Sequence, residues 1–338
     1  MRAIGPGTGQ RALSLSPTFT VVIPTFNHAE YLRVALQSVL DQTCQDFEVI
    51  VVNNYSSDHT LDVIREIGDS RIRVINFRNE GVIGASRNEG IKESLGRYVA
   101  FLDSDDRWRE NKLERVAQVF EEGPGLGLVC HDLALVREGQ EVARTRFGPP
   151  PSYRGTLYDH LLFSFNGPAT SASVVVKHKL EEAGMFSQDP NLVTVEDYGL
   201  WLELAKICEF RFIPEVLGEA TLHSDNASGN VELHLRNGLA LIDKQCAALR
   251  ESERTYPRRA IRRLYARSYF VAARRYHRRN VFKQTFGYYL QTIWVYPLFG
   301  RAYLGLGLLM AGSLLRPVRR NGSRGAVIGP SSRWGSQL

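Results

Sequence analysis

Four apolar runs, separated by segments with helical periodicity, fill the first hundred residues of this 338-residue chain. Each run is rich in β-branched residues and does not alternate with polar positions, which indicates burial on both faces. Such strands, alternating with amphipathic helices, are typical of an α/β protein with a mainly parallel, Rossmann-like sheet and helices on both faces. The expected strands are Phe19 to Ile23, Phe47 to Val52, Ile72 to Asn76 and Tyr98 to Leu102.

The segments between these runs predict three helices. Apolar residues recur at three- and four-residue spacing in the ranges 27–41, 61–67 and 85–95. Asn27, with Glu30 three residues later, has the form of an N-terminal cap for the first helix. Gly96 is expected to end the third helix as a C-terminal cap.

Beyond residue 126 the pattern is looser but still mixes strands and helices. We interpret the range 126–224 as the second half of the same domain. The expected elements are strands at Leu128 to Cys130, Ser173 to Val176 and Arg211 to Pro214, and a helix at Val195 to Ile207.

Length and cysteine usage bound the class of protein. A chain of 338 residues can bury one large core and carry an appendage. Its four cysteines are far apart and form no C-x-x-C pair, which argues against a zinc site or a disulfide framework and favours a reducing compartment. Residues 1–17 are rich in Gly, Ser and Pro and lack the apolar core of a secretory signal, so we expect a disordered leader.

Three carboxylates, Asp103, Asp105 and Asp106, follow the fourth expected strand. Open parallel sheets present ligand sites at the carboxyl ends of their strands, and Mg²⁺ or Mn²⁺ prefers oxygen ligands. A D-x-D triplet occurs by chance about once in a chain of this length, so its position at a strand end carries the prediction. The alternative is that Asp103 or Asp106 caps a helix that starts near Arg107.

A second acidic pair, Glu196 and Asp197, stands at the head of the helix expected at Val195 to Ile207. The helix dipole favours an anion at this position. From spacing alone, a role in chemistry and a role in capping the helix are equally open, with Trp201 and Leu204 in the core.

Five motifs occur in an order that resembles family 2 glycosyltransferases over Thr18 to Ser228. The resemblance implies a single catalytic domain with a GT-A fold, which moves a sugar from a nucleotide diphosphate sugar with inversion at the anomeric carbon. It divides the chain into residues 18–106 for the nucleotide sugar, 107–230 for the acceptor, and a helical region at 231–338. The motifs are VIPTFN at 22–27, FEVIVVNNYS at 47–56, ASRNEG at 85–90, FLDSDD at 101–106 and the pair at 196–197.

The resemblance also implies roles for the acidic residues. Asp105, with Asp103 nearby and Asp106 as a further candidate, would hold the Mg²⁺ or Mn²⁺ that stabilises the departing diphosphate. Asp197 would be the general base and Glu196 the fallback. Repulsion between the two carboxylates is expected to raise the pKa of one of them. His223 resembles part of a loop that closes over the metal and the diphosphate, although a lone histidine is more often structural.

Donor binding is implied for residues at the ends of the first two strands. By resemblance, Pro24, Thr25, Phe26, Asn27 and Asn54 cradle the nucleobase and ribose, with Phe26 offering a stacking face, and Arg87 approaches the diphosphate or the base. The alternatives are a core position for Phe26 and a solvated one for Arg87. The family usually has Asp-Asp where this chain has Asn53-Asn54, so a uridine donor is expected while thymine and guanine stay open.

The carboxyl-terminal region is strongly basic. From Pro257 onward it has fifteen Arg, one Lys and no acidic residue, which gives +16 and leaves −10 for residues 1–256. A basic amphipathic helix is expected at 258–279, an aromatic one up to Tyr296, and an uncharged stretch at 302–315. Fourteen residues are short for a membrane span of about twenty.

We therefore expect an interfacial or re-entrant helix that lies on anionic lipid. The alternatives are a helix packed on the catalytic domain and a nucleic-acid-binding tail, and the apolar stretch disfavours nucleic acid.

The expected function is metal-dependent, inverting sugar transfer to a lipid-linked or polysaccharide acceptor, in a cytoplasmic protein held at the inner face of the cell membrane. One alternative is a non-catalytic nucleotide-sugar sensor or scaffold, which the Asn53-Asn54 departure motivates. A pyrophosphorylase ranks last, because no glycine-rich phosphate loop follows the first strand.

Overall fold

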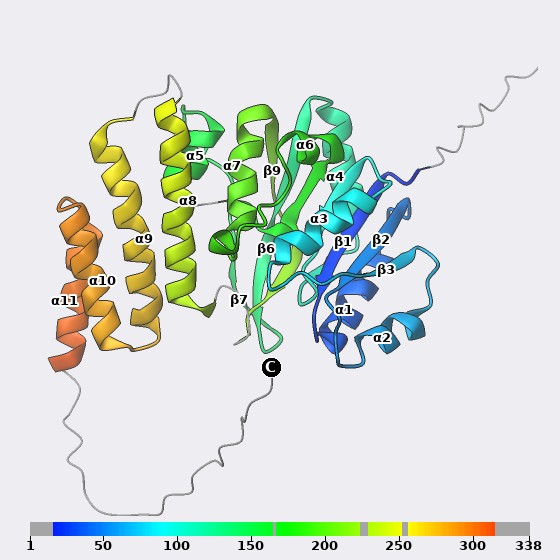
Figure 1. The fold of residues 1–338 in the computed structure, drawn as a ribbon, viewed down its shortest axis with the longest axis horizontal. Coiled ribbons are helices and arrows are strands. Elements are labelled where there is room, and N and C mark those ends of the chain that lie inside the picture. The colour runs from blue at the N-terminus through cyan, green and yellow to red at the C-terminus, as the bar shows by residue number, and fades with distance from the viewer. Residues whose placement is uncertain (1–15, 165–166, 224–228, 252–255, 315–338) are drawn as a thin grey trace, which may run out of the picture.

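The computed structural model describes residues 16–164, 167–223, 229–251 and 256–314. A central sheet carries helices on both faces, and a stack of four helices extends from one side of it (Figure 1). The leader expected at residues 1–17 falls almost wholly outside the described residues. The α/β class predicted from the sequence is confirmed.

The amino-terminal half is a regular alternation of strands and helices. All four predicted strands are present, and β2, β1 and β4 lie side by side with parallel neighbours. The elements are β1 (Phe19–Thr25), α1 (Ala29–Leu40), β2 (Phe47–Asn53), α2 (Thr60–Ile67), β3 (Ile72–Asn76), α3 (Ile83–Glu93) and β4 (Tyr98–Phe101).

The second half adds strands of both directions. β8 pairs antiparallel with β4 and with β6, whereas β6 and β9 are parallel, and the sheet order is β3-β2-β1-β4-β8-β6-β9-β5. The elements are β5 (Arg107–Trp108), α4 (Lys112–Glu122), β6 (Leu126–Arg137), β7 (Gln140–Arg144), α5 (Leu157–Ser164), β8 (Ser173–Val176), α6 (Lys177–Glu182), α7 (Glu196–Ile207) and β9 (Glu209–Thr221), with short 3-10 turns at Thr170–Ala172 and Pro190–Leu192.

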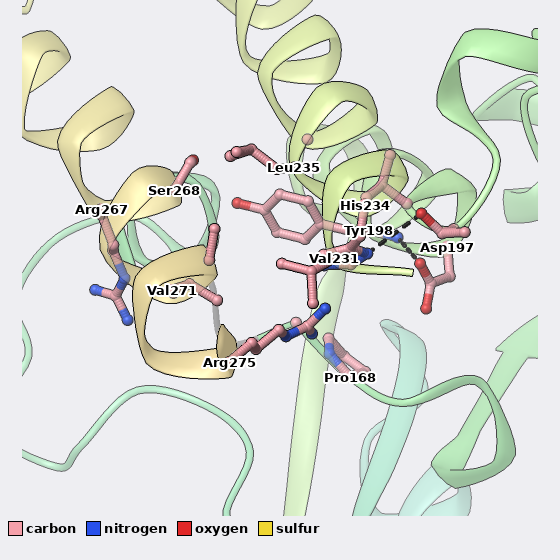
Figure 2. A pocket seen from close by; sticks show the side chains of 15 residues that line it. Pro168, Asp197, Tyr198, Val231, His234, Leu235, Arg267, Ser268, Val271 and Arg275 are labelled. Carbon is pink, nitrogen blue, oxygen red and sulfur yellow. Dashed lines mark hydrogen bonds between the residues drawn. The ribbon is translucent and has the colours of Figure 1, made fainter. Parts of the chain in front are cut away.

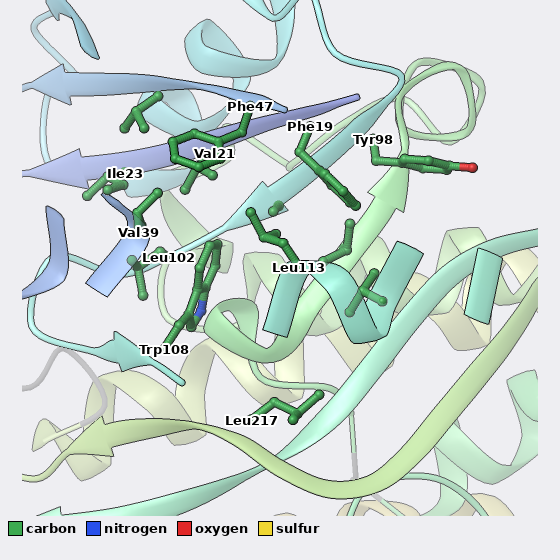
Figure 3. Close-up of a cluster of buried hydrophobic side chains, with 14 of the residues drawn as sticks. Phe19, Val21, Ile23, Val39, Phe47, Tyr98, Leu102, Trp108, Leu113 and Leu217 are labelled. Carbon is green, nitrogen blue, oxygen red and sulfur yellow. The ribbon is translucent and has the colours of Figure 1, made fainter. Parts of the chain in front are cut away.

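Apolar side chains fill both faces of the sheet. Val21 and Ile23 of β1 point to one face and pack with α1 and α4, in the cluster drawn in Figure 3. Val22 points to the other face and belongs to a cluster that includes Ile91 of α3 and Trp201 of α7. This two-sided burial is the reason that the strands read as continuous apolar runs.

Two capping predictions and one capping alternative are wrong. Asn27 does not cap α1, because it has a left-handed backbone (φ 52°) and its Oδ1 accepts the Ser57 N–H at 2.7 Å; Asp58 instead accepts the Ala29 N–H at 3.1 Å. Gly96 does not cap α3, which ends at Glu93; it is needed because a Cβ there would meet the Thr20 nitrogen at 2.5 Å. No helix starts near Arg107, since β5 occupies that position and α4 begins only at Lys112.

Four helices follow the sheet. They are α8 (Val231–Glu251), α9 (Arg258–Arg278), α10 (Phe282–Val295) and α11 (Gly300–Leu314). α8 packs against α7 where Leu241 lies beside Gly199, α9 packs against α8 and α5, and α10 and α11 lie farther out (Figure 1). Among the described residues, no helix is both long and apolar enough to cross a membrane. The domain division at residue 230 stays a prediction.

Candidate active site

Residues from distant motifs meet at the carboxyl ends of β1, β2 and β4. The Asn54 N–H donates to the Thr25 carbonyl at 2.9 Å, which joins the ends of β2 and β1. β4 lies on the other side of β1, so the acidic run that follows β4 comes to the same edge. The parallel register of the strands therefore assembles the predicted donor and metal residues.

The residues predicted to bind the nucleotide include a loop at the end of β1, which hydrogen bonds hold in place. The Asn27 backbone N–H donates to the Ser56 hydroxyl at 2.9 Å, and its side chain holds Ser57, so the loop after β2 is bound to the loop after β1. Phe26 is 53% exposed, and the alternative that it belongs to the core is wrong. An exposed aromatic ring at this edge is available for stacking on a base.

Asn53 and Asn54 occupy different environments. Asn53 is buried, its Oδ1 accepts the Ser56 N–H at 3.0 Å, and its amide donates to Asn76 across the sheet at 2.8 Å. The Oδ1 of Asn54 accepts the Asn79 N–H at 3.1 Å. Asn53 thus holds the ends of β2 and β3 together, and of the two residues only Asn54 is partly accessible.

Asp105 and His223 come together although 118 positions separate them in the chain. The His223 Nε2 lies 2.8 Å from the Asp105 Oδ2, and its ring stacks on Tyr31 at 5.3 Å between centroids. Sequence reasoning missed two partners in this cluster: Tyr31, and His28, whose Nδ1 lies 2.9 Å from the Ser104 hydroxyl. Residues 224–228 of the loop predicted to close here lie outside the described residues.

The side chains around Asp105 fit the expected divalent cation only in part. Within the described part of the chain, no group of three or more His, Cys, Asp or Glu is arranged to hold a metal. A carboxylate and an imidazole nonetheless fit a cation that takes most of its ligands from substrate phosphates and water. Asp105, His223 and the nearby Asp103 are the residues that would hold it.

Asp106 has a structural role. Its two oxygens accept the Ser171 hydroxyl at 2.6 Å and the Thr221 N–H at 3.0 Å. Burial, and then the charges of Asp103 and Asp105, raise the pKa of Asp106 well above its ordinary value. Because its oxygens are directed at these donors, Asp106 joins the end of β4 to β9.

Arg87 is a buried clamp between two acidic motifs. Its guanidinium donates to Asp103 Oδ1 and to Glu196 Oε1, each at 2.8 Å, and the side chain is 4% exposed. Burial alone would lower the pKa of Arg87, but the charges of Asp103 and Glu196 outweigh it and raise the pKa above its ordinary value. The alternative of a solvated residue is wrong, and both of its carboxylate bonds are internal to the protein.

The rest of the ASRNEG motif fastens α3 to the segment before α7. The Asn88 amide donates to the Phe186 carbonyl at 2.8 Å and accepts the Phe186 N–H at 2.9 Å. A Cβ on Gly84 would meet the Ser187 carbonyl oxygen at 2.9 Å and Glu196 Cγ at 3.3 Å. Sequence reasoning missed this role, because its partners lie about a hundred residues away and give no local signal.

Glu196 and Asp197 differ sharply at the head of α7. Val195 is the N-cap of α7 and makes no side-chain bond, whereas Asp197 Oδ1 accepts the Tyr198 N–H of the first turn at 2.6 Å. Asp197 therefore helps to satisfy the start of the helix, and the capping alternative stays open for it. Glu196 is bound to Arg87. Burial, and then the charge of Glu196, raise the pKa of Asp197 to about 7, with Arg87 opposing the rise. Asp197 is thus suited to accept a proton near neutral pH.

A cavity of about 370 Å³ opens beside Asp197. Figure 2 shows Asp197 and Tyr198 on one side, residues of α8 including His234 and Leu235, and Arg267, Ser268, Val271 and Arg275 coming from α9. The helices after the sheet therefore form part of the wall around the candidate base.

Residues 20–171 match the sequence model described as Glycosyl transferase family 2. Residues 20–171 therefore form a family 2 glycosyltransferase domain, as the sequence motifs predicted. Family 2 members are glycosyltransferases, as the sequence predicted, and the chain is accordingly a transferase.

Three relatives are named as glycosyltransferases or as a chondroitin synthase, and each match covers more than half of this chain. TuaG of Bacillus subtilis, a glycosyltransferase assigned to teichuronic acid biosynthesis, is 29% identical over 63% of this chain and 82% of its own length. An uncharacterised glycosyltransferase of Nostoc sp. is 38% identical over 51% of this chain and 54% of its own. Chondroitin synthase of Pasteurella multocida is 26% identical, and the match covers 71% of this chain and 24% of that enzyme.

Solved structures share the fold. Staphylococcus aureus TarS residues 1–349, in complex with UDP-GlcNAc, has a TM-score of 0.57 and 19% identity, and the match covers 87% of both chains. The mannosyltransferase PcManGT of Pyrobaculum calidifontis, in complex with GDP-Man and Mn²⁺, has a TM-score of 0.55 and 17% identity over 90% of this chain and 83% of its own. The GT-A fold expected from the motifs is confirmed.

Proposed function

We propose that this protein is a metal-dependent, inverting glycosyltransferase that moves a sugar from a nucleotide diphosphate sugar, a UDP-sugar in the first instance, to a lipid-linked or polysaccharide acceptor. One observation carries the proposal. Arg87 binds both Asp103 and Glu196, so the acidic end of β4 and the head of α7, with Asp197, are held at one edge of the sheet.

The chemistry needs a base for the acceptor and a stabilised leaving group. As the oxygen of an acceptor hydroxyl attacks the anomeric carbon, Asp197 accepts the proton of that hydroxyl. The bond from that carbon to the diphosphate oxygen breaks, and the nucleoside diphosphate leaves with the electron pair. Asp105, with His223 and Asp103, would hold the Mg²⁺ or Mn²⁺, which would supply positive charge to the leaving diphosphate.

The proposed donor rests on the residues at the ends of β1 and β2 and on the solved structures that share the fold. Phe26 and Asn54 offer a stacking face and an amide at the end of the first two strands, and the related folds bind UDP-GlcNAc in TarS and GDP-Man in PcManGT. The TuaG and chondroitin synthase names favour an acceptor in polysaccharide synthesis at the cell envelope.

The decisive experiment offers the protein a panel of nucleotide sugars with Mg²⁺, Mn²⁺ or a chelator, and measures the nucleoside diphosphate released. We expect release from one donor class and its loss with the chelator. No release from any donor would favour the alternative, a nucleotide-sugar-binding sensor or scaffold.

Asp197→Asn separates the two functions directly. For an enzyme, transfer should fall by at least about 100-fold, the usual contribution of a general base, while nucleotide-sugar binding survives. Asp62→Asn, at an exposed position on α2, is the matched control. Transfer that persists in Asp197→Asn would contradict the assignment of the base.

We further propose peripheral attachment to the inner, cytoplasmic face of the cell membrane through α10 and α11. Large apolar side chains on these helices and in the turn between them are exposed, among them Trp294 at 77%, Leu298 at 81%, Leu304 at 66% and Leu308 at 60%. Arg301 lies among them, and α9 carries pairs of arginines. Exposed apolar groups beside cationic ones favour an anionic lipid surface.

A further inference from the structure

The cavity beside Asp197 has a basic wall. Arg267 and Arg275 line it from α9 and are both half-buried, whereas the adjacent Arg274 is exposed and lines a different hollow. In Figure 2 the Arg275 side chain extends from α9 toward the side on which Asp197 lies. A cavity that contains a candidate base and two arginines is suited to a molecule with a hydroxyl and a negative charge.

Two acidic side chains of α8 are bound to tyrosines. Glu232 of α8 accepts hydrogen bonds from the hydroxyls of Tyr276 and Tyr288, and Asp243 accepts one from Tyr265. Burial lowers the pKa of Arg267; Tyr198 opposes this, and repulsion from Arg263 and Arg301 adds to it. Burial, and then repulsion from Arg279 and Arg278, lowers the pKa of Arg275. A bound anion would relieve this repulsion.

The basic wall continues away from Asp197. A second hollow of about 630 Å³ shares Arg267 and Val271 with the cavity and adds Arg263 and Arg301. Arg267 and Arg275 are eight residues apart, which is about 12 Å along a helix. This spacing suits an extended anion, such as a diphosphate or a phosphodiester chain, better than a single carboxylate.

We propose that the cavity between α7, α8 and α9 is the acceptor subsite, and that it takes an acceptor bearing phosphate, which Arg267 and Arg275 bind while its hydroxyl faces Asp197. The assignment rests on the proposed transferase function, because it places the attacking hydroxyl at the candidate base. It names the substrate class: a hydroxylated phosphodiester or diphosphate, from a polymer or from a lipid headgroup.

Binding tests the subsite without turnover. Titration calorimetry on the full chain uses three probes: a short glycerol-phosphate oligomer, farnesyl-diphosphate-linked N-acetylglucosamine in detergent, and an uncharged chito-oligosaccharide. We expect at least one phosphate probe to bind more tightly than the uncharged one and to weaken as salt is raised. The better phosphate probe identifies the source of the anion.

Arg275→Gln and Arg267→Gln should each weaken the better phosphate probe by about 10- to 100-fold, the effect of losing one hydrogen bond between charged groups. Arg274→Gln is the control and should bind like the wild type. Unchanged unfolding temperatures and nucleoside-diphosphate affinity show that the variants are folded.

Equal binding of charged and uncharged probes, or equal binding by the Arg275 and Arg274 variants, would overturn the inference. Transfer kinetics keep the two proposals apart. If the wild type cleaves a nucleotide sugar but ignores phosphate acceptors, the subsite is wrong and the transferase stands. If phosphate binds as expected and no donor is cleaved, the transferase is wrong and the subsite stands as a binding site.

Discussion

Asp197 and Glu196 are adjacent carboxylates with different surroundings. Glu196 is bound to the Arg87 guanidinium, whereas Asp197 lies in the wall of a cavity, and its pKa is raised to about 7 by burial and by the charge of Glu196. The environment therefore selects which member of the pair can exchange a proton near neutral pH.

The raised pKa predicts a pH profile. Asp197 must be ionised to accept a proton, so kcat/KM should rise with pH and level off above an apparent pKa of about 7. The free energy of unfolding should move in the opposite direction. The stabilisation from protonated Asp197 is complete below its unfolded pKa of about 4 and is lost as pH rises through 7. Initial rates from pH 5.5 to 9, with Asp62→Asn beside the wild type, provide the check, and a flat profile would contradict it.

Lys112 is a buried lysine beside Trp108, which lies in the apolar cluster on the α1 and α4 face of the sheet. It is fully buried, its Nζ lies 3.2 Å from the centre of the Trp108 ring, and in the described structure this Nζ has no hydrogen-bond partner. Burial lowers the pKa of Lys112 well below its ordinary value. A charged form here costs free energy that an apolar side chain would not.

Lys112→Met should therefore stabilise the protein, by roughly 1 to 3 kcal/mol on the scale found when buried charged groups are replaced by apolar ones. The gain should be larger at pH 6 than at pH 10, because a lowered lysine pKa makes the wild type more stable as pH rises toward the unfolded value. Urea unfolding measures it, with exposed Lys244→Met as the control. A loss of stability at both pH values would show that the ammonium is needed.

At the scale of elements, α3 organises the site. Arg87, Asn88 and Gly84 bind it to the end of β4 and to the segment that leads into α7. The sequence motif suggested contact with the donor, and the structure gives Arg87 two internal partners. Its effect on transfer would then be exerted through the position and charge of other residues.

Arg87→Gln distinguishes positioning from donor contact. Loss of the guanidinium charge leaves Asp103 and Glu196 unneutralised, so the apparent pKa of the transfer reaction should rise above about 7 and kcat should fall by about tenfold or more. Breaking a buried ion pair also costs about 3 to 5 kcal/mol of stability. Exposed Arg65→Gln is the control. A large rise in donor KM with an unmoved pH profile would point instead to direct contact with the diphosphate.

At the scale of the whole molecule, net charge and proposed function divide between two parts of the chain. The acidic body carries the candidate site. Helices α8 and α9 line the cavity beside Asp197, α10 and α11 lie farther out (Figure 1), and the net positive charge begins at the start of α9. The expectation of a helix on lipid and the alternative of a helix packed on the catalytic domain apply to different helices, because α8 packs against α7 while α10 and α11 expose apolar side chains.

Membrane attachment predicts that a double substitution, Leu304→Glu with Leu308→Glu, releases the protein from vesicles. Each leucine that leaves the lipid forfeits about 1.5 to 3 kcal/mol, so sedimentation with phosphatidylglycerol vesicles should fall by at least tenfold. Val142→Glu, at a comparably exposed apolar residue on β7, is the control. Wild type that fails to sediment with anionic vesicles, or a variant that sediments like it, would rule the attachment out.

The sequence by itself determined the strands, most of the helices and the placement of acidic residues at a strand end. These features depend on periodicity over a few residues, and parallel strands necessarily bring their carboxyl ends to one edge. Only the tertiary structure decided the rest. Asp58 caps α1 from another loop, Arg87 reaches Glu196 across 109 positions, and His223 reaches Asp105 across 118. Such contacts leave no trace in local spacing, because they form only when distant segments pack together.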